Sequence, residues 1–322
     1  MTRTLTPTRA VVLDGIATVV SSIIHGGDRA GTVTYLRREQ IVQPDGSVED
    51  VPVLSGNALR GILRDHSAEM LWMQLGQPEL AMPVFHALWS GGSLAKAGSG
   101  KALDPVRLAQ LRRLVPHVAI FGAAGGGRII EGKLRVGKLV PLVTETAHIV
   151  PDRLAGHCTS TYEDRVQLEH YTRTDDGRKA TWRELGAAPQ PAALTTGATG
   201  ALITADPATG EVEPDDETTQ MRYGVETLAA GTRLWCSFGL SHVTDLEWAW
   251  FCQILAQWTA SGGHIGGRSA VGHGRLRLEL DEFGSLAPAL VRHSEVTQQH
   301  AEIAAHADAH RAEIIEALTW LA

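Results

Sequence analysis

Alternating apolar and polar residues predict several strands along this chain. The predicted strands cover residues 9–24, 127–143, 229–243 and 275–283. The first is rich in β-branched residues and ends just before the glycine pair at 26–27. After it, the sequence PDG (44–46) indicates a turn between two further extended segments.

Apolar residues at helical spacing predict two main helices. The first covers about residues 55–76, with Ser55 or Asn57 as its N-cap and Gly76 just beyond its end. The second follows the capping box that Thr244 and Glu247 form, and it ends at Gly262. A shorter helix over 104–115 and one or two alanine-rich helices over 288–322 complete the set.

The order of these elements predicts the fold class. Without the intervening segments it is strand, helix, strand, strand, helix, strand, which is the β-α-β-β-α-β pattern of a ferredoxin-like α+β fold. Residues 173–220 are rich in Gly, Pro, Thr and Ala and close with an acidic cluster, so they predict an excursion from this core with a hairpin near DPATG.

Composition limits the possible partners and the compartment. The chain of 322 residues is 43% hydrophobic and carries a net charge of −7, so a nucleic-acid partner needs local basic patches. The three cysteines have no C-x-x-C spacing, which argues against a disulfide framework or a cysteine zinc site and fits a reducing cytoplasm. The uncharged run over 15–24 is too short to span a bilayer, so no membrane association is expected.

The glycine-rich segment GGHIGGRSAVGHGRL (262–276), called the glycine loop below, nearly matches a nucleotide-binding P-loop, with Arg268 in the place of the lysine. A P-loop follows a strand and opens a helix, whereas this segment follows a helix and precedes a strand. Two interpretations remain open. The glycines form tight corners with positive φ, or their bare backbone, with Arg268 and Arg275 beside it, lies against a polyanion.

Two more segments have the residues that a polyanion requires. The first helix turn, at Ser55 to Asn57, has free amides, and Arg60 and Arg64 follow on one helix face. The alternative is an ordinary N-cap with solvated arginines, and Arg60 and Arg268 are expected at the surface.

A third basic group follows the first strand and comprises His25, Arg29, Arg37 and Arg38. In a ferredoxin-like fold it lies near the start of the first helix. The glycine loop is expected at the opposite end of the sheet unless a strand end or an insertion brings it round, so the topology does not establish that all three segments meet.

Other candidate chemistry is weaker. His306 and His310 have metal-ligand spacing on a helix, but no third ligand is evident, so a solvated face is preferred and no metal or other cofactor is assigned. Neither a G-x-S-x-G elbow nor a cysteine with an evident catalytic partner is found. The aromatic signature of an ordinary RNA-recognition motif is also lacking, which argues against base stacking on the sheet.

Five segments in order resemble the RAMP superfamily of CRISPR-associated proteins. They are VPVLSGNALRGILRD, AIFGAAGGGRIIEGKLRV, YTRTDD, ETLAAGTRLWCSFGL and GGHIGGRSAVGHGRL. The resemblance is to the Cas-seven group, the repeated backbone subunit of multi-subunit effector complexes, and the spacing from HGGDRAGT to SGNALRG is most similar to the type IV version. The segments run from about residue 10 to 283.

The resemblance implies an architecture and a set of partners. It implies an RRM-like palm (1–65 with 119–160 and 223–285), a helical insertion (66–118), a β-hairpin thumb (160–223) and a C-terminal helical tail (286–322). It also implies copies that stack into a filament along a guide CRISPR RNA, which pairs with a target nucleic acid, together with other effector-complex subunits.

The resemblance also implies which residues bind the guide. Ser55, Asn57 and Arg60, together with Gly266, Gly267 and Arg268, match positions that hold guide phosphates, independently of guide sequence. The remaining RNA-binding candidates are His25, Arg29, Arg64, Arg173 and His264.

Some related subunits cleave target RNA with an aspartate in the loop after the first strand, and Asp28 lies in that loop. It directly follows the glycine pair, whereas the cleaving members have theirs further along. A non-catalytic scaffold is therefore expected, and a metal-dependent endoribonuclease that uses Asp28 is the alternative.

Overall fold

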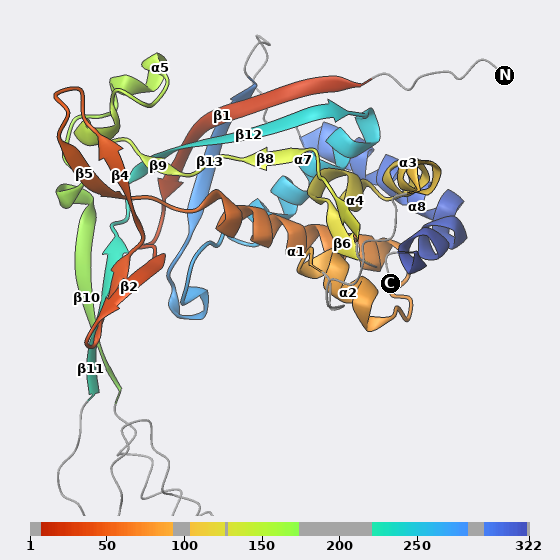
Figure 1. The fold of residues 1–322 in the computed structure, drawn as a ribbon, viewed down its shortest axis with the longest axis horizontal. Coiled ribbons are helices and arrows are strands. Elements are labelled where there is room, and N and C mark those ends of the chain that lie inside the picture. Colours follow the sequence, from red (N-terminus) through yellow and green to blue (C-terminus); the bar gives the residue numbers. More distant parts are fainter. Residues whose placement is uncertain (1–7, 93–103, 126–127, 174–220, 283–292, 321–322) are drawn as a thin grey trace, which may run out of the picture. The chain divides into compact units, whose positions relative to one another are not determined.

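The computed structural model describes residues 8–92, 104–125, 128–173, 221–282 and 293–320. The chain divides into two compact units. Figure 1 shows the helices and strands of the described residues, coloured along the sequence. The first unit comprises residues 1–28, 35–167 and 226–322, and the second comprises residues 29–34 and 168–225.

An antiparallel sheet forms the centre of the first unit. Its strands are β1 (Arg9–Val19), β8 (Leu134–Val136), β9 (Val140–Pro141), β12 (Arg233–Val243) and β13 (Leu276–Glu282). They are ordered β13-β1-β12-β8, with β9 also paired to β12, and every one of these pairs is antiparallel. With helices α1 (Gly56–Gln74) and α7 (Asp245–Ala260), this arrangement confirms the predicted α+β fold.

Two predicted strands differ in the structure. The strand over 127–143 is divided into β7 (Arg128–Ile130), β8 and β9, and β7 pairs with β6 (Ala123–Gly125) instead of joining the central sheet. Between β7 and β8 the backbone at Gly132 passes so close to Ile120 and Gly122 that a side chain there would collide with them, which explains the glycine. The first strand ends at Val19 instead of residue 24.

The region between β1 and α1 contains more strands than predicted. It contains β2 (Gly26–Ala30), β3 (Val33–Leu36), β4 (Arg38–Val42) and β5 (Val48–Pro52). β4 and β5 form the hairpin that turns at PDG, where Gly46 has a φ of 88°. The turn prediction is therefore confirmed.

Helices cover one face of the central sheet. Alternate β1 residues such as Leu13 and Ala17 are buried in the same core as Leu63 of α1 and Trp250 of α7. Both predicted N-termini are confirmed: Ser55 caps α1, and Thr244 forms a capping box with Glu247 at α7.

The first unit also contains the helices α2 (Met82–Trp89), α3 (Pro105–Leu114), α4 (Pro116–Phe121) and α8 (His293–Thr319). α1 continues past the expected palm boundary at residue 65. Buried residues of these helices, including Val84, Leu111 and Ile314, join the same core as the sheet. The segments expected to be an insertion and a tail thus contribute directly to the stability of this unit.

The opposite face of the sheet is partly covered by the segment that follows β9. It contains η1 (Thr144–Thr146) and α5 (Asp152–Ala155). Val150 and Leu154 of this segment pack with Ile16 and Trp235 from the sheet in a second apolar cluster. This part of the sheet face is therefore closed to base stacking.

The second unit contains residues of four strands ordered β10-β11-β3-β2, where β10 is Val166–Arg173 and β11 is Met221–Leu228. β11 and β3 run parallel, with Gly224 beside Val33. Tyr171 and Tyr223 stack with ring centroids 5.6 Å apart. The expected hairpin near DPATG lies outside the described residues.

A chain of hydrogen bonds crosses the core of the first unit. The Trp250 indole N–H donates to Ser67 Oγ (2.8 Å), and Ser67 lies 2.8 Å from Nδ1 of the fully buried His117. Because Nε2 of His117 lies 3.1 Å from the Leu88 carbonyl, it is the ring nitrogen that donates, and Nδ1 accepts from Ser67. Burial, and then the charge of Arg64, lower the pKa of His117 to about 3, so the ring is neutral.

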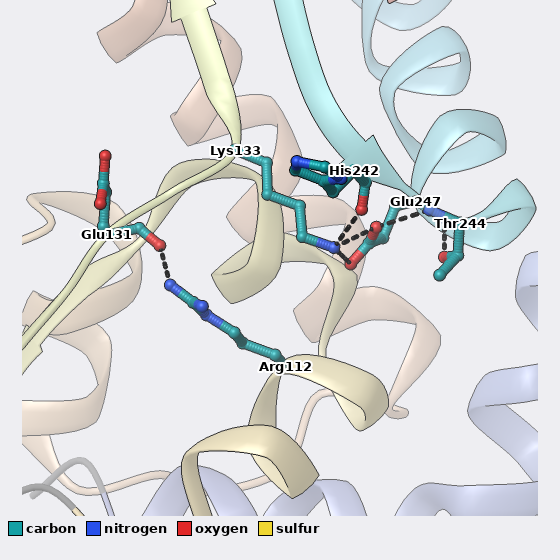
Figure 2. Close-up of polar contacts among 6 residues, drawn as sticks. All are labelled: Arg112, Glu131, Lys133, His242, Thr244 and Glu247. Carbon is teal, nitrogen blue, oxygen red and sulfur yellow. Dashed lines mark hydrogen bonds and ion pairs between the residues drawn. The ribbon is translucent and has the colours of Figure 1, made fainter. Parts of the chain in front are cut away.

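An ion pair joins the start of α7 to the segment before β8 (Figure 2). Lys133 Nζ lies 2.6 and 2.7 Å from the two carboxylate oxygens of Glu247 and donates to the His242 carbonyl at 2.9 Å. The same carboxylate accepts the Thr244 N–H at 2.8 Å, as the capping box requires. The Glu247 side chain is only 6% exposed, so removing one partner of the pair leaves the other charge mostly buried and unpaired.

We predict that Glu247→Gln destabilises the protein by about 3 kcal/mol, because Lys133 loses its counter-charge in a mostly buried place. Urea unfolding of both proteins measures the difference. Glu316→Gln, on the exposed side of α8, is the matched control and is expected to change stability by less than about 0.5 kcal/mol. Equal effects of the two substitutions would contradict a stabilising role for this pair.

We also predict that stability falls as the pH drops below about 6.5, the ordinary pKa of histidine. His117 then becomes protonated in the unfolded chain, whereas in the folded protein it stays neutral down to about pH 3. The slope from this residue is about 1.4 kcal/mol per pH unit. Urea midpoints measured between pH 7 and 4 for the parent and for His117→Gln test this, because the parent is expected to show the steeper loss.

Candidate nucleic-acid interface

The end of β1 and the start of β13 lie side by side. Because the two strands are antiparallel, Val19 pairs with Leu276, and the glycine loop that leads into β13 lies where the chain leaves β1. The expectation that this loop lies at the opposite end of the sheet is therefore wrong. The strand direction decides this point: an antiparallel partner begins where its neighbour ends.

Backbone hydrogen bonds tie the glycine loop to residues 20–24. The Gly267 N–H donates to the Ile24 carbonyl and the Gly274 N–H to the Ser22 carbonyl, both at 2.9 Å. The Arg275 N–H donates to Ser21 Oγ at 3.1 Å. These bonds fix the loop against the segment that follows β1.

His25 connects the same segment to helix α1. Its Nε2 accepts the N–H of Ser55, the helix N-cap, at 3.1 Å. Burial, and then the nearby Arg37 charge, lower the pKa of His25, so the ring is neutral and able to accept this bond. The three segments singled out in the sequence therefore meet at one end of the first unit, and His25 serves there as a link rather than as a cation.

The first turn of α1 is built as an N-cap. Ser55 Oγ accepts the Asn57 N–H at 3.2 Å, which uses one of the free amides of the turn. A side chain at Gly56 would collide with the carbonyls of Val136 and Gly137, which explains the glycine. Asn57 is exposed.

Arg60 and Arg64 do not lie free at the surface, so the expectation of solvated arginines is wrong. Both guanidinium groups donate to the carbonyl of Phe121, at 2.9 and 2.7 Å, and both lie over its ring. Arg64 is 8% exposed, and burial, then the charge of Arg60, lower its pKa to about 10. The reason is that α4 ends at Phe121, where a helix leaves carbonyls without partners and a negative dipole end.

Within the glycine loop, the corner interpretation is confirmed. Gly266 has a φ of 81° and Gly274 a φ of 85°, and side chains there would collide with the carbonyls of Ile24 and Ile265. The Gly267 N–H already donates to the Ile24 carbonyl. Arg268 has a φ of 61°, an unusual value for a residue with a side chain, and it begins the short turn η4 (Ser269–Val271).

The other candidates are placed differently. His264 is half-buried, with Nδ1 3.4 Å from the His273 carbonyl. Arg29 and Arg173 belong to the second unit: Arg29 is exposed and donates to Thr34 Oγ1 at 3.3 Å, while Arg173 ends β10 and its side chain lies outside the described residues.

The structure adds residues that were not among the predicted RNA-binding set. Arg37 and Arg275 are exposed at the converging segments, and Ser21 and Ser22 join the glycine loop to the chain after β1. The two arginines were visible in basic stretches of the sequence. The two serines gave no signal, because their role depends on contacts across more than 250 residues.

Other predicted features lie apart from this interface or have different partners. Asp28 is exposed in β2. His306 Nε2 bonds to the Leu114 carbonyl at 2.9 Å, so this histidine is not simply solvated. Within the described ranges, no three His, Cys, Asp or Glu side chains gather as a possible metal site. Among the described helices, none combines the length and hydropathy needed to cross a membrane.

The fold and this interface define an α+β palm with a glycine-rich, basic end. A solved structure titled "Type IV-B CRISPR Complex" contains a similar chain, with 26% sequence identity and a TM-score of 0.55. The similarity covers 89% of this chain and 96% of that chain. No protein-family model and no curated protein sequence matches the chain.

We predict that Gly266→Ala destabilises the protein by at least about 1 kcal/mol, since the new side chain meets the Ile24 carbonyl at a positive φ. Gly61→Ala is the control: it lies within α1 with open space around it, and it is expected to stabilise by about 0.5 to 1 kcal/mol. Thermal unfolding measures both. A neutral result at Gly266 would show that the loop is not fixed against residue 24.

Proposed function

We propose that the chain is a subunit of a CRISPR effector complex and that it binds guide RNA without cleaving it. The extent of the similarity supports the first part, because nearly the whole of the chain from the type IV-B complex is matched. The interface supports the second part. Copies of the chain then stack along the guide and present it for pairing with a target.

One observation carries the RNA-binding part: the three predicted segments meet at a surface with basic groups. Arg37 comes from the segment after β1, Arg268 and Arg275 come from the glycine loop, and the exposed Asn57 lies in the adjoining helix turn. Arginine guanidinium groups bind phosphate oxygens well, and such contacts carry no sequence information. A surface of this kind suits a subunit that accepts any guide.

The net negative charge of the chain does not argue against RNA binding. Salt-dependent attraction to RNA depends on charge at the contact surface, and the net charge of −7 belongs to the whole chain. The roles of Arg60 and Arg64 change, however. Their guanidinium groups bind the Phe121 carbonyl, so in this proposal they support α1 from within.

We predict that Arg268→Glu combined with Arg275→Glu weakens binding of a fluorescein-labelled single-stranded RNA at least about tenfold at low salt, because the changes remove two cations and add two anions. Fluorescence anisotropy over a series of salt concentrations measures this. The slope of log affinity against log salt is expected to fall by about 2. Arg60 is unsuitable for this test because its loss also disturbs the fold.

Arg113→Glu is the matched control, because Arg113 is exposed on α3, away from the interface. It is expected to leave RNA affinity within a factor of about two. RNA affinity unchanged in the double variant would contradict the interface. Regular cleavage of a complementary RNA with magnesium, lost in Asp28→Ala, would contradict the non-catalytic part and favour the endoribonuclease.

A further inference from the structure

A pocket of about 360 Å³ opens on the outer side of α1, between α1 and α2. Its lining is a single stripe of α1 together with one α2 residue: Ile62, Asp65, His66, Glu69, Trp72 and Trp89. The α1 residues recur three or four positions apart, which places them on one helix face. This face is neither the one that packs on the sheet nor the one that holds Arg60 and Arg64.

The two indole rings of the pocket are held in place by their neighbours. The Trp72 N–H donates to the Pro78 carbonyl at 3.1 Å. Phe85 contacts both rings, edge-on to Trp72 at 6.3 Å and tilted against Trp89 at 5.3 Å between centroids. The rings are therefore fixed before anything binds, and their faces offer the negative side of the aromatic quadrupole.

The carboxylates of the pocket have no ion-pair partner among the described lysines and arginines, although the charges of the neighbouring His66 and Arg64 act on Asp65. Asp65 and Glu69 are exposed one turn apart, and neither forms an ion pair with a described lysine or arginine. Like charges at this spacing destabilise a helix. Burial raises the pKa of Asp65 by more than the charges of His66 and Arg64 lower it, so its charged form is not fully compensated by the surrounding protein. A cation in the pocket relieves both effects.

The combination of groups selects one class of ligand. The carboxylates repel RNA phosphates, and an apolar ligand would leave the carboxylates without a partner. A guanidinium group satisfies both elements, because it stacks on indole rings and its planar N–H groups donate hydrogen bonds to a carboxylate. The volume is near the lower limit for ligand pockets, which fits a single side chain better than a larger ligand.

We propose that this pocket binds an arginine side chain presented by a protein partner. The site goes beyond RNA binding and does not use the same residues. Glu69 lies 14 positions after the N-cap Ser55, or about 21 Å along the helix, so α1 presents an RNA contact at its start and a protein contact further along. Both can be occupied together.

The test uses the full chain with ¹⁵N-labelled tryptophan, in which each of the eight indole N–H groups gives one NMR signal. Trp72→Phe and Trp89→Phe assign the two pocket signals. The probe is an acetylated, amidated Gly-Gly-Arg-Gly-Gly peptide, and the comparison peptide has citrulline, which has the same shape without charge. The arginine peptide is expected to shift both pocket signals and to bind at least tenfold more tightly than the citrulline peptide.

Asp65→Asn combined with Glu69→Gln is expected to weaken arginine-peptide binding at least tenfold while RNA affinity stays within twofold. The matched control, Glu79→Gln with Glu316→Gln, removes two exposed carboxylates outside the pocket and should leave both affinities unchanged.

Equal binding of the two peptides, or no shift of either pocket signal, overturns the proposal. Movement of the same signals by polyuridine RNA, with no response to the peptide, also overturns it. RNA affinity is measured separately, so failure of the RNA-binding function is distinguishable from failure of the pocket.

Discussion

The antiparallel pairing of β1 with β13 is the constraint on which the interface depends. It sets Val19 beside Leu276, so the end of the first strand and the start of the last one share an edge of the molecule. The glycine loop then bonds to Ile24, and His25 bonds to the N-cap of α1. Three separate segments of the sequence thus form one surface. The contacts that bring them together all lie within the protein and do not require RNA.

The polar groups of the first unit show how much of its charge supports the fold. Arg60 and Arg64 satisfy the carbonyl at the end of α4, and Lys133 compensates Glu247 at the start of α7. Helix ends need such partners because their amides and carbonyls have none within the helix. A basic residue near a helix is therefore not, by its presence, a ligand-binding residue.

Charge is distributed over α1 in a way that suits two kinds of partner. Near its start the helix adjoins a surface with basic side chains, and further along it carries two carboxylates beside fixed indole rings. In the two proposals, a chain with a net negative charge binds a polyanion at one place and a cationic side chain at another. In the proposed complex, this separation keeps the RNA contact and the protein contact from competing.

The sequence by itself determined the α+β class, the caps at Ser55 and Thr244, and the PDG turn, because each depends on residues only a few positions apart. It also marked all three segments of the interface. Only the tertiary structure decided that they meet, and that Arg60 and Arg64 turn inward to Phe121. Strand direction and the partner of a helix end are long-range properties, and local pattern does not contain them.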